Sequence, residues 1–340
     1  MAIPKSTLVS LLPLISPTFA WGTLGHDTVA LIAQSFITPK TASFAKSLLN
    51  DTTSTYLGNV ATWADSYRYT AEGAFSSPLH YIDALDTPPS SCNVDYERDC
   101  PEEGCIVSAI ANYTTRVSNK NLSVTERQKA LKWVIHFLGD IHQPLHVENL
   151  AVGGNTINVT FDGTKTNLHH IWDSNMPEKL IGGYSMDDAK DWSTTLIKEI
   201  TTGRYANASS SWLKGMNIKD SVGSAMVWAT DANSFVCTTV VPKGEAAVAG
   251  QELDGAYYDS AIPVIQLQIA KAGYRLAAWL NLIVEGSTEL KGSSHGYKTG
   301  HVPEKTVVKR EITELEDWMV EARRVRRAYG WNCGPEGHQH

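Results

Sequence analysis

Apolar residues recur at helical spacing along most of this chain, and that periodicity limits the fold more than any other feature of the sequence. The segments with this pattern are residues 28–37, 41–49, 60–69, 106–117, 126–141, 221–236 and 261–283. With 42% hydrophobic residues in 340, the chain has enough apolar surface for a well-buried core. We therefore expect a mainly α fold.

One segment departs from the helical pattern. After Gly153-Gly154-Asn155, residues 156–161 alternate between polar and apolar side chains and end at Asp162-Gly163. Such alternation followed by a turn pair predicts a short β-hairpin. The expected fold class is thus a single compact helical domain with a short β-hairpin.

The first twenty residues have the three parts of a secretory signal peptide. Lys5 supplies the charged part, residues 8–15 the apolar part, and Thr18-Phe19-Ala20 the cleavage end. The apolar run is too short to cross a bilayer, so we expect no membrane anchor. Cleavage would make Trp21 the first residue of a secreted, extracellular protein. Its free amine and its carbonyl oxygen can then chelate a metal.

Five cysteines follow this segment, and export makes disulfides the expected state. Cys92, Cys100, Cys105 and Cys237 allow three pairings, and the sequence alone cannot fix the connectivity. The short spacing from Cys100 to Cys105 suits a local loop. Cys92 would then pair with Cys237, and Cys333 would be the odd cysteine. Sequons for glycosylation, each a weak match by itself, lie at Asn50, Asn112, Asn121, Asn158 and Asn207.

The composition changes around residues 285–298 to Gly, Ser, Thr and Lys, which is typical of a linker. Beyond it, residues 311–329 have a charged amphipathic pattern that contains two pairs of arginines. Residues 287–340 are then either a removable C-terminal extension or an appended helix that docks on an acidic surface. The main domain is expected to span residues 21–286.

The formal net charge of −7 argues against one class of function. Proteins that bind nucleic acid by neutralising many phosphates carry clustered Lys and Arg. Any phosphate binding here must come from a local positive centre, and bound divalent cations are the obvious candidate.

The densest group of chemically active side chains lies in residues 133–146, where three histidines and one aspartate fall within eleven residues. In a helix, His136 and Asp140 are one turn apart and share a face. Pro144 then ends or bends the helix and directs His146 to a different point. Downstream, His169 and Asp173 repeat the same spacing. One such pair is more often an ordinary surface pair, but two pairs imply metal ligation.

Together with His26, His80 and Asp65, these residues give a mixed nitrogen and oxygen ligand set that suits Zn²⁺. Three protein ligands per ion leave a position open to water, and no cysteine-rich zinc motif occurs. A catalytic zinc site is therefore favoured. His142 and His170 lie beside better-placed ligands, and we interpret them as core or supporting histidines.

At these residues the chain resembles a known family. The stretches that carry the resemblance are Trp21-Gly22 with His26, residues 63–68, Leu79-His80-Tyr81, residues 136–146, Gly153-Gly154-Asn155, and residues 167–169 with Trp172-Asp173. Their order and spacing are similar to those of the zinc-dependent class I nucleases of fungi and plants, the single-strand-specific nuclease and 3′-nucleotidase family. The resemblance runs from Trp21 to about residue 284 and implies the fold that these nucleases share with phospholipases C.

The resemblance implies a centre of three zinc ions. The implied ligands of the first ion are Asp65, His80, His136 and Asp140. Those of the second are the amine and carbonyl of Trp21, His26 and a bridging Asp140. Those of the third are His146, His169 and Asp173. Such a centre attracts phosphate in spite of the acidic surface, and it activates water for attack on phosphorus.

The resemblance also implies three catalytic residues. Arg68, one helical turn after Asp65, would stabilise the transition state, and the alternative is a surface arginine. Asp65 would orient the attacking water as well as bind metal. Asn155, on its Gly-Gly turn, would contact the substrate, although Asn also favours turns for conformational reasons alone.

Base recognition is expected to be modest. Tyr81 either stacks on an unpaired base or packs as a core aromatic. Asp83 would accept hydrogen bonds from a base edge, and Val152 would close the other face of the slot. Because a slot for a splayed base excludes a stacked duplex, a preference for single strands follows.

The leading hypothesis is a secreted zinc phosphodiesterase that acts on single-stranded RNA and DNA, releases 5′-phosphorylated products, cleaves 3′-nucleotides and has no stable protein partner. The first alternative is a zinc phospholipase C, against which stand the His169–Asp173 pair, the short spacing from Trp21 to His26, and the lack of a lipid rationale for Arg68 and Asp83. The second alternative is a metal-stabilised binding glycoprotein, which would need closed metal coordination.

Overall fold

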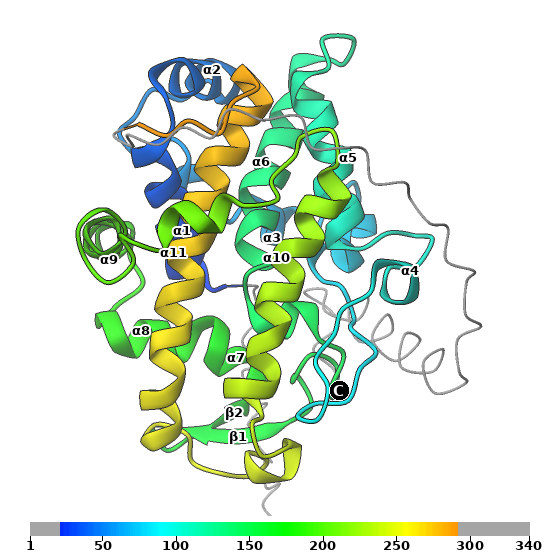
Figure 1. Cartoon of the computed structure of the whole chain (residues 1–340), viewed down its shortest axis with the longest axis vertical. Coiled ribbons are helices and arrows are strands. Elements are labelled where there is room, and N and C mark those ends of the chain that lie inside the picture. The colour runs from blue at the N-terminus through cyan, green and yellow to red at the C-terminus, as the bar shows by residue number, and fades with distance from the viewer. Residues whose placement is uncertain (1–20, 292–340) are drawn as a thin grey trace, which may run out of the picture.

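The computed structural model describes residues 21–291, so the expected signal peptide and the tail with Cys333 lie outside the described residues. The described chain is mainly helical with one two-stranded antiparallel sheet, which confirms the expected fold class (Figure 1). The elements are α1 (Thr23–Phe36), α2 (Pro39–Leu49), α3 (Trp63–Tyr67), α4 (Tyr96–Asp99), α5 (Ile106–Ser118), α6 (Val124–Asp140), β1 (Asn158–Phe161), β2 (Thr164–Asn167), α7 (Leu168–His170), α8 (Met176–Ile181), α9 (Met186–Thr201), α10 (Ser221–Phe235) and α11 (Ala256–Glu285).

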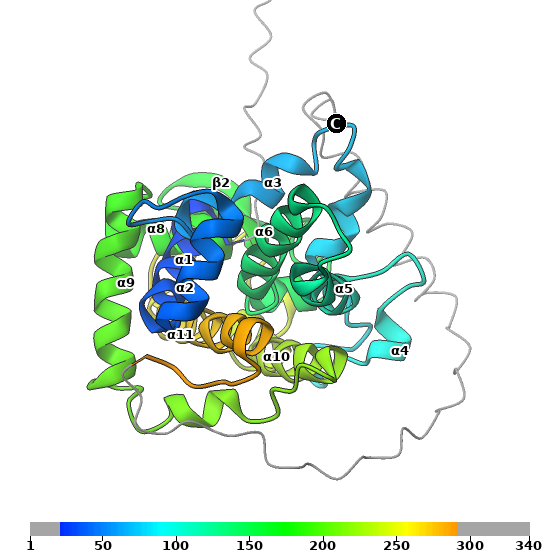
Figure 2. The same cartoon turned by 90° about the horizontal axis from the view of Figure 1, so that it is seen from above.

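The longest helix, α11, organises the fold. Most of its residues from Ala261 to Leu282 are buried, and it packs against α1, α2, α6 and α9. Figure 1 shows α11 along the length of the molecule, and Figure 2 shows α9 and α4 at opposite sides. Trp279 of α11 donates its Nε1–H to the Thr114 hydroxyl of α5 at 2.8 Å. These contacts make a rigid frame for the residues that project between the helices.

Two differences from the predicted elements have physical causes. Residues 60–69 do not form one helix, because Thr62 leaves helical geometry (φ −96°, ψ 3°) and the Ala61 carbonyl accepts a hydrogen bond from His136. Helix α9 is absent from the predicted segments, although its buried apolar residues do recur at helical spacing: Ala189, Trp192, Leu196 and Ile200. The hairpin is present, with Asn158 paired to Asn167 and Phe161 to Thr164.

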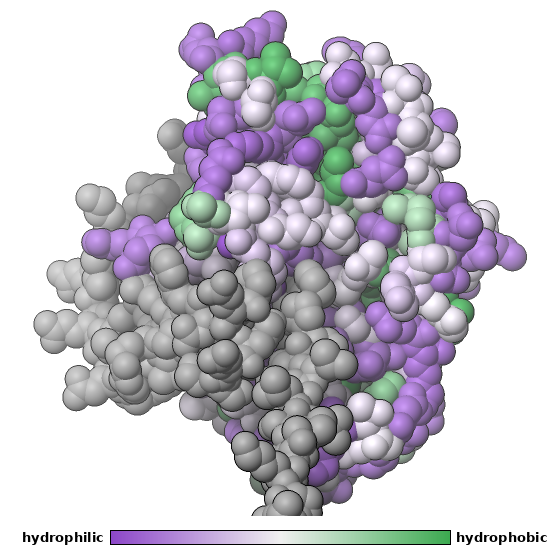
Figure 3. Space-filling model, turned by 180° about the vertical axis from the view of Figure 1, so that it is seen from behind, coloured by the Kyte–Doolittle hydropathy of each residue, from purple (hydrophilic) through white to green (hydrophobic). Residues whose placement is uncertain are grey.

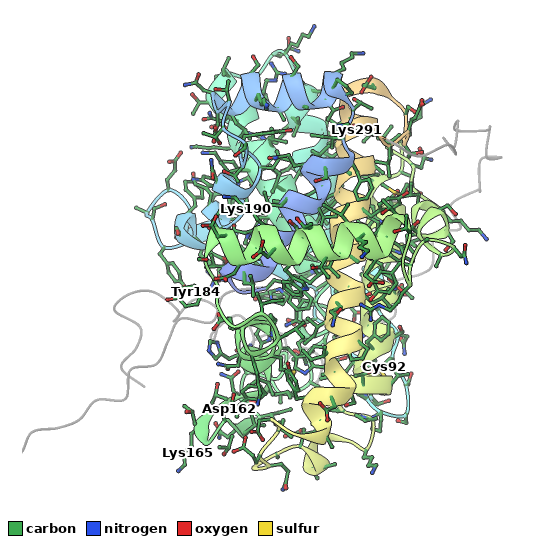
Figure 4. The ribbon with its side chains drawn as sticks, turned by 90° about the vertical axis from the view of Figure 1, so that its left-hand side faces the viewer. Cys92, Asp162, Lys165, Tyr184, Lys190 and Lys291 are labelled. Atoms are coloured by element: carbon green, nitrogen blue, oxygen red, sulfur yellow. A yellow bond between two sulfur atoms is a disulfide. The ribbon has the colours of Figure 1, made fainter. Side chains whose placement is uncertain are left out.

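Both disulfides favoured by the cysteine spacing are present. Cys92 is bonded to Cys237 across 145 residues, and Cys100 is bonded to Cys105 across five. The first bond ties the loop before α4 to the end of α10, which places two distant parts of the chain together (Figure 4).

The surface of the described part is largely polar. On the face shown in Figure 3, hydrophilic side chains are interspersed with small hydrophobic patches. The five sequon asparagines at positions 50, 112, 121, 158 and 207 are all exposed, as glycan attachment requires. Within residues 21–291, no helix has the length and apolar character needed to cross a membrane.

Candidate metal centre

Three histidines from distant parts of the sequence converge on one buried aspartate. Asp140 is the last residue of α6. Its carboxylate Oδ1 lies 3.0 Å from His26 Nε2, and its Oδ2 lies 2.9 Å from His80 Nδ1 and 3.2 Å from His136 Nε2. Asp65 of α3 completes the group, with a carboxylate oxygen 3.6 Å from His136 Nε2. All five side chains are at most 1% exposed, so this group lies inside the helical frame.

A second group contains His146, His169 and Asp173. His169 Nε2 lies 3.1 Å from the Asp173 carboxylate and 3.2 Å from His146 Nε2. Helix α6 ends at Asp140, and His146 lies in a separate 3₁₀ turn, Pro144–Val147. Pro144 therefore separates the two groups, as its position in the sequence predicts.

Trp21 lies beside this second group. Its side chain is fully buried, and the next residue, Gly22, donates its backbone N–H to the Asp173 carbonyl at 2.8 Å. One turn further along α1, His26 reaches Asp140 of the first group. The segment from Trp21 to His26 therefore connects the two groups.

Backbone carbonyls orient three of these imidazoles. The Nδ1–H groups of His136, His146 and His169 donate to the carbonyls of Ala61, His80 and Gly153, at 2.7, 2.8 and 2.6 Å respectively. With Nδ1 protonated, the Nε2 lone pair of each ring points into its group, which is the arrangement that metal-binding histidines need.

The two groups fit a bound metal. Several buried atoms of these groups have no hydrogen-bond partner within the described residues: His26 Nδ1, both oxygens of Asp65 and His80 Nε2. Leaving buried polar atoms without partners costs free energy, and a coordinated cation removes that cost. Imidazole nitrogens and carboxylate oxygens are also the donors that zinc accepts.

The electrostatics of the histidines agree with this interpretation. Burial lowers the pKa of His80 and that of His146 to about 4, so both rings are neutral near pH 7 and have a free lone pair. Burial also opposes the charge on His136, but the neighbouring carboxylates of Asp140 and Asp65 raise its pKa to about 9. A metal ion bound there would displace that proton.

Gln143 supports the second group and could not be identified from the sequence pattern. Its fully buried side chain donates Nε2–H to Asp173 at 2.6 Å, and its Oε1 accepts the backbone N–H of Leu145. The amide thus fixes the carboxylate of Asp173 relative to the turn that carries His146. The contact is made across 30 residues, so local spacing gives no signal for it.

Gly139 permits the close approach of His26 to α6. A Cβ atom at this position would lie 2.8 Å from His26 Nδ1 and 3.0 Å from its Cε1. We expect Gly139→Ala to displace the ring from Asp140 and to weaken metal binding about 10- to 100-fold, measured by titration against a chelator. Gln128→Ala on the same helix is the control. In a helix interior, replacing Gly by Ala usually raises stability. A Gly139→Ala protein that is more stable and binds metal with unchanged affinity would contradict the expectation.

A left-handed turn supports the second group. Ala151, Val152, Gly153 and Gly154 all have positive φ, at 49°, 61°, 62° and 79°. Only glycine adopts this conformation without strain, so two of the four positions are strained. The turn directs the Gly153 carbonyl at His169 and leads into Asn155, whose amide donates to the Val152 carbonyl at 2.8 Å.

The strain at Ala151 predicts an unusual stability effect. Ala151→Gly is expected to raise the free energy of unfolding by about 1 kcal/mol, because glycine relieves the left-handed conformation. The same substitution at Ala111 in α5 is expected to lower it by about 1 kcal/mol. Thermal denaturation of both variants measures the two shifts, and a destabilised Ala151→Gly protein would refute the strain argument.

The residues expected to contact substrate do not all line one pocket. Tyr81 and Asp83 line a pocket together with Pro78, Asp99, Pro101, Gly104 and Cys105. Val152 is buried and is not among the residues that line it. Arg68 follows α3, with its guanidinium carbon 5.0 Å from the centre of the Tyr69 ring, and its NH2 donates to the Tyr69 hydroxyl at 3.1 Å.

His142 belongs to the core, as its position in the sequence suggests. Its Nδ1–H donates to the Leu138 carbonyl at 2.7 Å, and its Nε2 accepts from Arg275 at 2.9 Å. Arg275 also pairs with Asp231 at 2.9 Å. Both ring nitrogens are therefore satisfied by the protein itself. His170 is partly exposed and adjoins His169.

Such a mainly helical domain, with two buried groups of imidazoles and carboxylates whose donor atoms converge, defines a protein with a candidate metal centre. Comparison with known proteins then gives the family. Residues 21–285 match the S1/P1 nuclease family, and the chain belongs to it.

The relatives include fungal and plant enzymes. The chain is 54% identical to Nuclease S1 of Aspergillus oryzae over 80% of this chain and 94% of that protein. It is 53% identical to Nuclease P1 of Penicillium citrinum, over 77% and 97% respectively. It is 34% identical to Endonuclease 2 of Arabidopsis thaliana, over 77% and 90%. These matches confirm the resemblance to class I nucleases and favour a nuclease over the phospholipase C and binding-glycoprotein alternatives.

Proposed function

We propose that this protein is a secreted endonuclease that uses three zinc ions to hydrolyse single-stranded RNA and DNA to 5′-phosphorylated products, and that it also dephosphorylates 3′-nucleotides. The observation that carries this proposal is the convergence of His26, His80 and His136 on the buried Asp140, beside a second group around Asp173. The nuclease names of the relatives point to the same substrate class.

The proposed zinc ligands follow the two groups. The first ion takes Asp65, His80, His136 and Asp140. The second takes the amine and carbonyl of Trp21 with His26 and Asp140. The third takes His146, His169 and Asp173. Bound zinc supplies positive charge for the phosphate and lowers the pKa of water.

The remaining catalytic residues act on the phosphate and the attacking water. Asp65 has two buried oxygens without hydrogen-bond partners, so one can bind metal while the other accepts a proton from water. Attack by the water oxygen on phosphorus breaks the P–O3′ bond and leaves a 5′-phosphate, and the released O3′ takes a proton from solvent to become a 3′-hydroxyl. Arg68 neutralises developing charge on the phosphate, and Asn155 donates to it from the left-handed turn.

Tyr81, Asp83 and Val152 are the proposed base contacts. Tyr81 is half-buried at the pocket and offers a ring face for stacking, worth roughly 1–3 kcal/mol for any base. Asp83 accepts from a base edge at the same pocket. Val152 does not line this pocket, and its proposed role in closing the other face of the slot rests on the family resemblance alone. A base enters only when it is unstacked, which favours single strands.

Secretion is part of the proposal. It rests on the N-terminal pattern, on two disulfides within the described residues and on the five exposed sequons. The substrates would then be extracellular nucleic acids.

One assay tests the function. The protein, processed to begin at Trp21, is incubated with single-stranded DNA, single-stranded RNA, duplex DNA and phosphatidylcholine, each with and without a chelator. We expect chelator-sensitive cleavage of the single strands and little cleavage of the duplex. Cleavage of the lipid but not of nucleic acid would overturn the proposal, and so would zinc content well below three equivalents in the active enzyme.

The N-terminus provides a further prediction. One extra residue before Trp21 turns the proposed amine ligand into an amide, so activity is expected to fall on the order of 10²-fold. Removal of that residue by a specific protease should restore activity, which separates loss of the ligand from misfolding. A zinc-loaded, extended protein with full activity would show that the amine is not a ligand.

A further inference from the structure

Helix α6 continues outward from the metal centre along one face. Lys132, His136 and Asp140 are spaced four residues apart on this helix. They therefore lie in one row, with about 6 Å of helix axis between successive members. Lys132 is the outermost member, one turn from the first group of ligands.

An aromatic pair holds the ammonium group of Lys132. Its Nζ lies 5.1 Å from the centre of the Trp63 ring, a cation–π contact. Trp63 is in turn stacked on Tyr67, with ring centres 4.3 Å apart, and packs edge-on against the buried Trp133. The lysine is thus fixed by a rigid aromatic support instead of moving freely in solvent.

Lys132 carries a positive charge that the protein does not neutralise. Within the described residues, no carboxylate forms an ion pair with it, and Lys129 is the charged neighbour that acts on it. Lys129, in contrast, forms an ion pair with Glu72, and its Nζ lies 3.8 Å from a carboxylate oxygen of Glu126. In an acidic protein, a positioned cation without a counterion suits an anionic ligand.

We propose that Lys132 binds a backbone phosphate of the single-stranded substrate next to the phosphate that is cleaved. The inference rests on the proposed function, since it assumes a polynucleotide at the metal centre. The row on α6 puts the Cα of Lys132 one helical turn from that of His136, and the contact of its ammonium with Trp63 reduces the entropy lost when the lysine binds. The subsite contacts the strand and is not needed for a nucleotide with a single phosphate.

The test compares substrates of two lengths. Lys132→Gln is expected to raise the KM for a single-stranded oligonucleotide about fivefold, with a smaller change for a 3′-mononucleotide. The slope of log(kcat/KM) for the oligonucleotide against log salt should become shallower by about 0.7, which is the value for one phosphate contact on a single strand. Lys132→Arg should restore most of the affinity.

Lys190 provides the matched control. It is exposed on α9 (Figure 4), which packs on α1 and α11. Figure 2 shows α9 apart from α6. Lys190→Gln removes the same charge and should leave both substrates and the salt slope unchanged. If Lys132→Gln and Lys190→Gln have the same KM for the oligonucleotide, the subsite is disproved. It is also disproved if Lys132→Gln raises the KM for both substrates equally. If the parent protein cleaves no oligonucleotide, the proposed function fails instead.

Discussion

Replacing Asp140 by Asn is expected to abolish nearly all phosphodiesterase activity, with a loss on the order of 10³-fold or more. Under the proposed centre of three zinc ions, it should also reduce bound zinc by up to two ions per chain. The side chain keeps its size, so packing is preserved. What changes is the charge at the point where His26, His80 and His136 meet. An amide offers a single oxygen and no negative charge, so it cannot bridge two cations.

The experiment measures metal content and activity on the same preparation. Asp162→Asn is the control, because Asp162 is an exposed carboxylate at the hairpin turn that pairs with Lys179 (Figure 4). It should retain both zinc and activity. An inactive Asp140→Asn protein with full zinc content would show that Asp140 acts in the chemical step and is not needed to bind metal. Full activity would show that Asp140 is not part of the metal centre.

Removal of the disulfide between Cys92 and Cys237 is expected to produce the largest loss of stability. The bond closes a loop across 145 residues, and chain-entropy arguments assign about 5 kcal/mol to a loop of this length. Such a loss is comparable to the whole stability of many domains. We therefore expect the Cys92→Ala, Cys237→Ala protein to unfold at far lower urea concentration, or not to accumulate in folded form.

The second disulfide is the internal comparison. Cys100 and Cys105 are five residues apart, and the same argument gives about 2 kcal/mol for the double alanine variant. Urea unfolding of both variants measures the difference. Equal losses would show that loop length does not govern the contribution of these bonds, and that local packing near Cys92 and Cys237 has to be considered instead.

The sequence predicts those parts of the site that depend on local spacing. His136 with Asp140, and His169 with Asp173, are each one helical turn apart, and the structure brings the members of each pair within 3.2 Å. Pro144 likewise marks the end of α6. In these cases the period of the helix alone places the side chains together.

Other parts of the site depend on tertiary contacts and have no local signal. His26 and His80 reach Asp140 only through packing of separate elements. Residue type includes them in a ligand set, but only the family resemblance assigns each to a particular ion. The contact of Gln143 with Asp173 is of the same kind. The left-handed turn at Ala151 and Val152 breaks the usual residue preferences, so no propensity argument predicts it.

The hydrogen bonds that orient His136, His146 and His169 all end on main-chain carbonyls, at Ala61, His80 and Gly153. A carbonyl is present whatever side chain occupies the position. Mutation of the acceptor residue therefore cannot delete the acceptor itself, as it would if a carboxylate or amide side chain held the ring. During evolution, residues such as Ala61 can be substituted while the imidazole keeps its orientation, provided that the path of the backbone is retained.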